Sequence, residues 1–373
     1  MSPRRLGRLA LLGFIAALAA CSSTDKLKPA ELGPNVVLQP VRAAWTAQIG
    51  SVAFPLQPSV QGSTLTLAAS DGTVAALDVL SGRDLWRVQV GARITAGVGG
   101  DGKTAAVVTD ENDVVAIESG RVLWRQKLPA QAYTPPLVAG GRVFVVSADR
   151  SVTALDGASG RKLWTQQRPG DALVLKQSGV LLAVADTLVV GQSGHLIGLN
   201  PSNGSVRWDS TIATARGTND VERLIDLVGR ASRSGNGVCA RAFQSSVGCV
   251  DAGRGQLLWS KKSNGSVGLG GDDKLLIGAE ADGKLLAWNR VDGERAWSSE
   301  LLMHRELSAP LLVGKSVVVG DGTGLLHVLS RENASPLNRL TTDGSAISVS
   351  PVLAGKTIVA VTRNGGVYGF VPE

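Results

Sequence analysis

The sequence predicts an all-β protein that folds as an eight-bladed β-propeller of four-stranded blades, and three observations support this. Seven tryptophans recur at intervals of 41, 38, 40, 44, 51 and 38 residues: Trp45, Trp86, Trp124, Trp164, Trp208, Trp259 and Trp297. Six of them end a recurring phrase, clearest as DGTVAALDVLSGRDLW (71–86), DRSVTALDGASGRKLW (149–164) and DGKLLAWNRVDGERAW (282–297). Apolar residues nowhere follow a helical spacing over a useful length. Self-similarity at a period of roughly 40 residues is typical of propellers and solenoids.

Each unit is expected to contain four short strands. An apolar run with an internal turn (58–70) is followed by the Asp71-Gly72 turn, a β-rich stretch (74–77), a second turn and a strand that ends in tryptophan. Runs of Val, Ile, Thr and Leu bounded by Gly, Asp, Asn and Ser are the pattern of strands and hairpins. A tight turn with positive φ requires glycine. Glycine recurs at one register of the second turn: Gly82, Gly160, Gly204, Gly255 and Gly293.

The count of units predicts how the ring closes. Seven units run up to Asn338, which occupies a tryptophan position, and residues 339–373 form an eighth that stops before its own tryptophan strand. The segment around Trp45 is such a strand with no unit before it. We therefore expect this strand to complete the last sheet, since a closed ring leaves only short, protected edges. The alternative is a seven-bladed ring with one irregular unit.

The N-terminus has the pattern of an export signal. Three arginines precede an apolar stretch (9–20) that is too short to span a bilayer, and it ends in Leu18-Ala19-Ala20-Cys21. This ending resembles the bacterial lipobox, so we expect residues 1–20 to be a lipoprotein signal peptide and Cys21 to carry palmitate-type acyl chains, enough for stable anchoring. An ordinary signal peptide with an incidental cysteine is the alternative. Residues 21–40 are predicted to be a lipidated flexible tether, and residues 41–373 the propeller.

Location and charge restrict the partners. Serines follow Cys21, which favours the outer membrane, with the protein on its periplasmic face. Removal of the signal lowers the net charge from +7 to about +4, spread along the chain without a basic patch interleaved with aromatic residues. We therefore predict no nucleic-acid partner.

Two further cysteines are candidates for a disulfide. Cys239 and Cys249 flank a predicted hairpin that turns around residues 243–246, so they lie opposite each other if the hairpin is symmetric. Export makes oxidation possible. Two buried thiols within a blade are the alternative.

The sequence contains no recognisable catalytic or metal site. The histidines His195, His304 and His327 do not form an HxH, HExxH or Cys/His cluster, and neither GxSxG nor a P-loop is present. We predict no catalytic residue, no metal and no cofactor. The recurring tryptophans are expected to pack between neighbouring blades rather than to bind sugars, and Trp288 is expected to belong to the core.

The phrase ALDxxSGxxxW, which runs from Ala76 to Trp86 and from Ala154 to Trp164, resembles the repeat of quinoprotein-type (PQQ-like) propellers. Together with the lipobox, the length of a single propeller and the eight units, it resembles the BamB family of outer-membrane assembly lipoproteins. The resemblance implies a non-catalytic scaffold of the β-barrel assembly machinery. Such a scaffold binds the periplasmic POTRA region of the BamA insertase and aids the assembly and insertion of β-barrel proteins with the rest of the complex.

The resemblance also implies partner-binding residues on two connectors. Leu173, Leu175 and Lys176 match the family's Leu-x-Leu-basic stretch, and Asp226 matches the first acid of an RLxDxD-like stretch that includes Arg223. Val228 stands where a second acid is expected. Both connectors leave a blade by the same strand, so they are expected on one face of adjacent blades, with their apolar residues forming a binding patch. Inward tucking of the leucines is the alternative.

Two other functions share the fold. One is a quinone-cofactor dehydrogenase. Such enzymes resemble larger chains that have an adjacent cysteine pair and a cluster of calcium ligands, whereas here no two cysteines are adjacent and the chain is short. A periplasmic sugar- or peptidoglycan-binding propeller is the third possibility. Within the assembly role, blade edges could also accept strands of unfolded outer-membrane clients.

Overall fold

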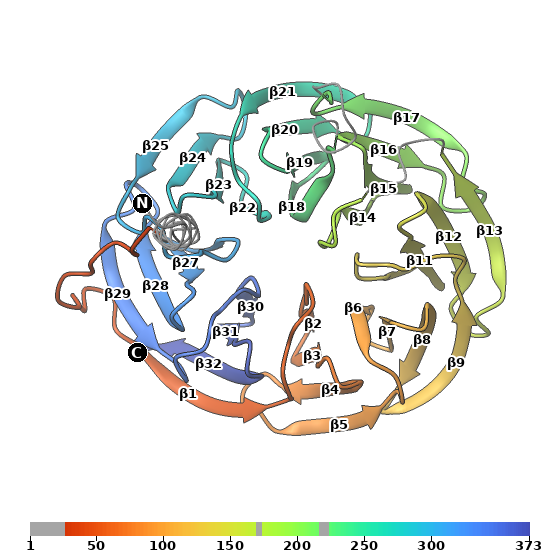
Figure 1. Ribbon diagram of the computed structural model, residues 1–373, viewed down its shortest axis with the longest axis horizontal. Helices are drawn as coiled ribbons and strands as arrows, with labels where there is room; N and C mark the ends of the chain where they lie inside the picture. The colour runs from red at the N-terminus through yellow and green to blue at the C-terminus, as the bar shows by residue number, and fades with distance from the viewer. Residues whose placement is uncertain (1–26, 169–173, 216–223) are drawn as a thin grey trace, which may run out of the picture.

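The computed structural model describes residues 27–168, 174–215 and 224–373, and eight four-stranded antiparallel sheets form a ring of blades around a central axis (Figure 1). The predicted all-β, eight-bladed propeller is confirmed, and the seven-bladed alternative is wrong. Within the described ranges every regular element is a strand. None of these residues belongs to a helix that could cross a membrane.

Blades 1 to 4 each follow the chain from the innermost to the outermost strand. Blade 1 contains β2 (Ser59–Gln61), β3 (Thr64–Ala68), β4 (Thr73–Asp78) and β5 (Asp84–Gln89). Blade 2 contains β6 (Ile94–Gly100), β7 (Thr104–Thr109), β8 (Asp113–Glu118) and β9 (Arg121–Lys127). Blade 3 contains β10 (Leu137–Ala139), β11 (Arg142–Val146), β12 (Ser151–Asp156) and β13 (Lys162–Gln167). Blade 4 contains β14 (Leu181–Val184), β15 (Thr187–Gln192), β16 (His195–Leu199) and β17 (Val206–Thr211).

Blades 5 to 7 repeat this order, and blade 8 takes its outermost strand from the start of the chain. Blade 5 contains β18 (Leu227–Ser234), β19 (Gly237–Ala242), β20 (Ser246–Asp251) and β21 (Gln256–Lys262). Blade 6 contains β22 (Leu269–Gly271), β23 (Leu275–Ala279), β24 (Leu285–Asn289) and β25 (Arg295–Ser299). Blade 7 contains β26 (Leu311–Val313), β27 (Ser316–Gly320), β28 (Leu325–Ser330) and β29 (Pro336–Thr341). Blade 8 contains β30 (Val352–Ala354), β31 (Thr357–Val361), β32 (Gly366–Pro372) and β1 (Val41–Gln48).

The links between strands divide the molecule into two faces. Because every blade is antiparallel, the hairpin between its second and third strands lies on the same face as the connector from its outermost strand to the next blade. We call this the connector face. The turns between first and second strands and between third and fourth strands lie on the opposite face, the turn face.

The tryptophans lock each blade to the next one, as predicted. The Trp45 ring lies against Gly82 in a turn of blade 1, and its Nε1 donates a hydrogen bond to Val79 O at 2.8 Å. Trp124 repeats both contacts with Gly160 and with Gly157 O at 2.9 Å. A methyl group on either glycine would overlap the ring, and both glycines have positive φ. The outer strand continues past its tryptophan instead of ending there.

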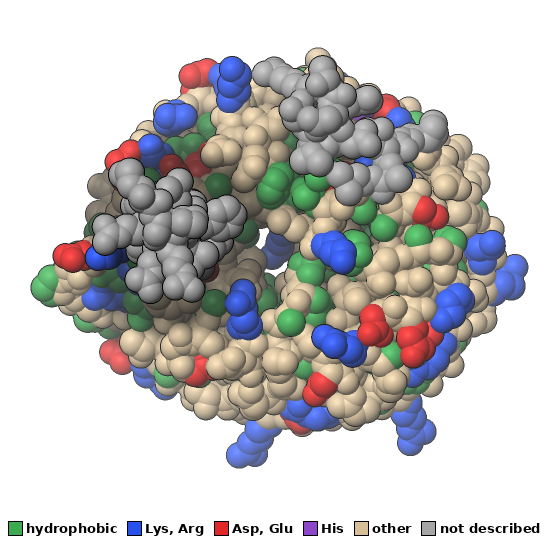
Figure 2. Space-filling model, viewed as in Figure 1, with side chains coloured by type: hydrophobic (Ala, Val, Ile, Leu, Met, Phe, Trp, Pro, Cys, Tyr) green, Lys and Arg blue, Asp and Glu red, His purple; other side chains and the backbone are tan. Residues whose placement is uncertain are grey.

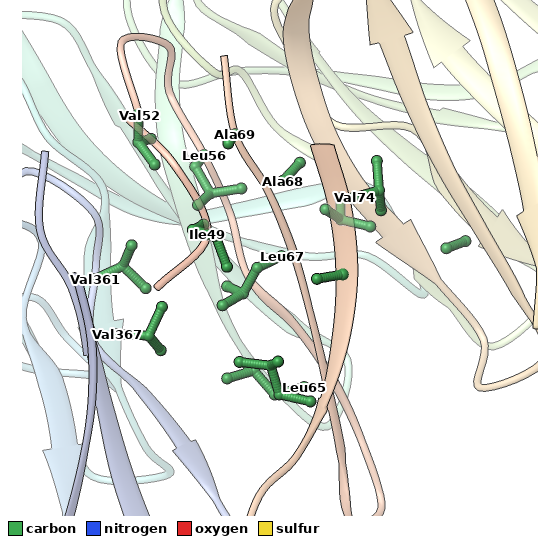
Figure 3. Packing of buried hydrophobic residues seen from close by; sticks show 14 of the residues in the cluster. Ile49, Val52, Leu56, Leu65, Leu67, Ala68, Ala69, Val74, Val361 and Val367 are labelled. Carbon is green, nitrogen blue, oxygen red and sulfur yellow. The ribbon is translucent and has the colours of Figure 1, made fainter. Parts of the chain in front are cut away.

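The ring closes where the two ends of the propeller meet. β1 pairs with β32 as predicted, and residues of blades 8 and 1 share one buried apolar cluster, in which Val361 and Val367 pack near Ile49 and Leu65 (Figure 3). No third-to-fourth-strand turn exists in blade 8, because these two strands come from opposite ends of the chain. Blade 8 therefore offers no such turn to an indole ring of blade 7, and Asn338 occupies the tryptophan position of that blade. Its Nδ2 donates a hydrogen bond to Gln39 O at 2.9 Å.

The segment before β1 is bound to blade 7 along much of its length. Leu38 N donates to Leu337 O of β29 at 2.9 Å, and Ala30 N donates to Met303 O at 2.9 Å. Arg305 Nη1 donates to Ala30 O at 2.8 Å. The prediction of a flexible tether over residues 21–40 therefore needs correction for residues 30–39, because the outer edge of β29 offers carbonyl groups to this segment. We call residues 30–39 the strap.

A disulfide joins Cys239 and Cys249 in blade 5. The two residues lie opposite each other in β19 and β20, and the hairpin between these strands spans residues 243–245. Both side chains are buried, and Trp288 of the adjacent blade belongs to the same apolar cluster, as expected for a core residue.

Substitution of Gly82 by Ala tests the contact between blades. We expect a loss of about 3 kcal/mol in the free energy of unfolding, because the methyl group combines an unfavourable left-handed backbone with overlap of the Trp45 ring. Gly62→Ala is the matched control, since Gly62 lies in the same blade at φ 59° with open space around its Cα. That control should lose only about 1 kcal/mol. Urea unfolding followed by tryptophan fluorescence measures both losses, and equal losses would contradict the interlock.

The double substitution Cys239→Ala/Cys249→Ala tests the disulfide. The bridge closes a loop with a sequence separation of 10 residues, so its removal should lower the free energy of unfolding by about 2–3 kcal/mol. A reductant should lower the urea midpoint of the parent protein and leave that of the variant unchanged. Equal responses of the two proteins to reductant would show that the bridge does not form.

Candidate functional site

The two connectors singled out by the sequence lie next to each other on the connector face, as expected. One joins β13 to β14 and the other joins β17 to β18. Leu173 and Arg223 lie outside the described residues. Leu175, Lys176 and Asp226 are described, and they belong to the adjacent junctions between blades 3, 4 and 5.

Asp226 joins the two connectors. Its Oδ2 accepts a hydrogen bond from the backbone N–H of Leu175 at 3.0 Å, across 51 positions of sequence. Its Oδ1 lies 3.4 Å from Nη1 of Arg150 in an ion pair whose side chains are only 15% (Asp226) and 8% (Arg150) exposed. A buried charge requires such partners. Asp226 is therefore mainly a structural fastener that fixes the backbone of Leu175.

Arg150 was not identified from the sequence, although a signal was present. It lies in the second-to-third-strand hairpin of blade 3, at the position that Gly72, Gly283 and Gly324 occupy in their blades. Like those glycines it has a positive φ, of 65°. This conformation costs a bulky residue roughly 1–2 kcal/mol. Its carbonyl accepts a hydrogen bond from Gln192 Nε2 at 2.9 Å, and its side chain reaches Asp226.

Part of the predicted apolar patch is not on the surface. Ile225 and Leu227 are apolar residues of the second predicted connector (209–235), and both are buried in the apolar cluster of blades 4 and 5. The expectation that the apolar residues of the connectors form an exposed patch is therefore wrong for these two, which point inward. Val228 is also buried and pairs with Arg241 in the register of β18 and β19. A second carboxylate at position 228 would lose its hydration inside the blade, which explains why an apolar residue occupies it.

The surface that remains accessible comes from the first connector. Val174 and Leu175 are half-buried and Lys176 is exposed. Val174 and Leu175 line a small cavity of about 60 Å³, to which Tyr133 of the connector between β9 and β10 also contributes. We call Tyr133, Val174, Leu175 and Lys176 the connector patch. Two apolar side chains, an aromatic ring and one cation on a fixed backbone suit the binding of a protein surface.

A second set of polar contacts holds the start of the first connector, at Arg168, against β16 and β17. Asp209 of β17 lies 2.7 Å from Arg168 Nη2 and 2.7 Å from His195 Nδ1. Partial burial alone would raise the pKa of the Asp209 carboxyl, but its hydrogen bonds with His195 and Arg168 outweigh burial and hold the pKa below its usual value. Both ends of the first connector are thus tied to the framework.

The described residues contain no group of three or more His, Cys, Asp or Glu side chains that could hold a metal ion. His195 and His327 lie in β16 and β28, the third strands of their blades. His327 Nε2 lies 3.0 Å from Asp321 Oδ2, and Arg305 Nε donates to the same oxygen at 2.8 Å. This buried cluster fixes Arg305, which holds the strap.

Comparison with known proteins identifies the family. The model of the family described as "Outer membrane protein assembly factor BamB" matches residues 70–299. The outer membrane protein assembly factor BamB of Bordetella pertussis is 36% identical over 368 residues, covering 96% of this chain and 95% of the relative. That of Burkholderia pseudomallei is 33% identical, covering 98% and 97%. The chain therefore belongs to the BamB family.

Solved structures agree on the fold. The crystal structure of BamB from Moraxella catarrhalis superimposes with a TM-score of 0.81 at 22% identity, covering 89% of this chain and 99% of that one. A quinohemoprotein alcohol dehydrogenase from Comamonas testosteroni superimposes with a TM-score of 0.69 at 14% identity, covering 89% and 78%. At these identities the likeness concerns the fold alone. The curated relatives carry the name of an assembly factor, which supports the prediction of a non-catalytic scaffold over the dehydrogenase alternative.

Asp226→Ala tests whether this carboxylate fastens the two connectors. We expect the N–H of Leu175 to lose its protection against hydrogen exchange and the free energy of unfolding to fall by roughly 2 kcal/mol, because a largely buried charge-assisted contact is removed. Asp186→Ala is the control: Asp186 also pairs with an arginine, Arg207, but its side chain is 80% exposed. The control should unfold at nearly the same urea concentration as the parent protein, because water screens this exposed ion pair. Unchanged exchange at Leu175 in Asp226→Ala would contradict the role of Asp226.

Proposed function

We propose that this member of the BamB family is a non-catalytic scaffold of the outer-membrane β-barrel assembly machinery and that its connector patch binds the periplasmic POTRA region of a BamA-type insertase. The observation that carries the proposal is the hydrogen bond between Leu175 N and Asp226 Oδ2. It holds an apolar side chain and an adjacent cation in a fixed position on the face of the ring. Pre-organised apolar anchors contribute most of the binding energy at protein interfaces.

The strap supports a defined orientation at the membrane. Residues 30–39 run along the outer edge of blade 7, and Ala30 reaches Met303 and Arg305 of the connector between β25 and β26. The chain therefore leaves the propeller on the connector face, the face that carries the patch. If Cys21 is lipidated as proposed, the nine residue-to-residue steps from Cys21 to Ala30 span at most roughly 30 Å. The connector face and the insertase would then both lie close to the periplasmic surface of the outer membrane.

The outermost strands offer a second kind of surface to unfolded clients. Leu85, Leu123 and Leu258 lie on β5, β9 and β21 and are exposed at the rim of the ring. An extended client strand could pair with such an edge through its backbone while its apolar side chains cover these leucines. The strap already occupies part of the edge of β29 in this way. Blade 7 is consequently the blade least suited to a client.

Leu175→Ser tests the proposed partner and its site. The full-length protein, reconstituted in lipid nanodiscs, is titrated with the purified POTRA region of the insertase from the same organism. We expect the substitution to weaken binding at least tenfold, or about 1.4 kcal/mol, since it removes an apolar anchor and leaves the Asp226 hydrogen bond to the backbone in place.

Leu80→Ser is the matched control, because Leu80 is 77% exposed and lies in a turn on the opposite face. The control should bind like the parent protein. Equal binding by Leu175→Ser, with its fold verified by circular dichroism, would place the interface elsewhere. Absence of binding in all three proteins would reject the insertase as the partner.

A further inference from the structure

The centre of the propeller is an open channel (Figure 2). Blades 1 to 7 and the connector that precedes β30 contribute residues to its wall, and its volume is about 460 Å³. These residues include Val60, Leu137, Leu182, Arg230 and Leu311. A second cavity of about 880 Å³ shares Gln57, Arg230 and Ser350 with this channel. The two cavities adjoin at these residues, and residues of several connectors between blades line the second cavity, which places it at the connector face.

This second, wider cavity has apolar walls and positive charges. Its wall includes the apolar side chains Phe54, Leu56, Val349 and Leu353 from connectors and β30. Lys176, Arg230 and Arg363 line the same cavity, and none of its described lining residues is an aspartate or a glutamate. Low-dielectric walls strengthen the field of such charges, so the space attracts anions.

Arg230 of β18 differs from the other arginines of the interior. Arg241 is fully buried and lies 3.1 Å from Glu280, and Arg305 lies 2.8 Å from Asp321. The Arg230 side chain is exposed to the water of the channel and makes no hydrogen bond or ion pair with any described residue. Burial lowers the pKa of its guanidinium, while the side chain is still open to the water of the channel. An anion from solution would provide the missing partner.

We propose that the channel binds a carboxylate carried on an apolar body, with the carboxylate at Arg230 and the apolar part against Phe54, Leu56 and Val349. A guanidinium matches a carboxylate with two parallel hydrogen bonds. The volume corresponds to typical small-ligand sites and admits a body of the size of an apolar dipeptide. Both the C-terminus of an apolar peptide and a short fatty acid have this chemistry. The site goes beyond the proposed scaffold function and does not require the insertase.

Calorimetric titration of the full-length protein tests this site with four probes. The first two are N-acetyl-valyl-phenylalanine with a free carboxylate and the same dipeptide with a terminal amide. Hexanoate represents the fatty-acid source, and inorganic phosphate represents an anion without an apolar body. We expect a free carboxylate on an apolar body to bind at least tenfold more tightly than the amide and than phosphate. A preference for the peptide acid assigns peptide ends as the source, and a preference for hexanoate assigns fatty acids.

Two variants separate the site from a general effect of charge. Arg230→Gln should remove the tenfold difference between acid and amide. Arg121→Gln makes the same change of charge at an exposed position of the outer strand β9 and should keep the difference. Equal binding of acid and amide by the parent protein would overturn the proposal. So would a difference that persists in Arg230→Gln, binding of phosphate as tight as that of the acids, or no binding of any probe.

Discussion

The contact of a tryptophan with a turn of the next blade is the interaction on which this ring depends. Each such contact places an indole ring over a turn residue with positive φ. In five of them the indole Nε1 also donates to a carbonyl of that turn: Trp45, Trp124, Trp164, Trp259 and Trp297. The buried Nε1 of Trp208 has no such partner among the described residues. Trp297 shows the limits of variation, because its Nε1 donates to Arg331 O at 2.8 Å while Ala334, with φ 59°, takes the place of glycine. A single blade leaves an apolar face exposed to water, so these contacts stabilise the fold only when all the blades are present and the ring is closed.

The way the ring closes leaves one junction, between blades 7 and 8, where a tryptophan contact cannot form. The third and fourth strands of blade 8 come from opposite ends of the chain, so no turn is available for a tryptophan of blade 7. Asn338 and the strap take over this junction with hydrogen bonds to Gln39 and Asn35. The same arrangement determines where the N-terminal segment leaves the ring. The position of the chain's exit is thus a consequence of how the ring is closed.

The sequence was sufficient for the framework and only partly sufficient for the candidate site. The number of strands and the closure of the ring follow from the period of the repeat, which a sequence displays directly. The symmetry of a single hairpin placed Cys239 opposite Cys249 and left two free thiols as the alternative. The inward position of Asp226 does not, because it depends on Arg150, 76 positions away in another blade. Leu227 illustrates the same difficulty: it reads as a connector residue, yet it begins β18 and is buried. Contacts between connectors have no period, so a repeat cannot reveal them.

Departures from the repeat are concentrated where the molecule offers its surfaces. Arg150 replaces a turn glycine, Asp226 ties two connectors together, and Arg230 lies in the channel without a partner among the described residues. The framework tolerates these changes because the tryptophan contacts between blades lie on the outermost strands, far from the axis, in seven of the eight blades. Lys176 belongs both to the connector patch and to the wall of the channel. A protein bound at the patch would therefore stand at the mouth of the channel, and occupancy of one surface would alter access to the other.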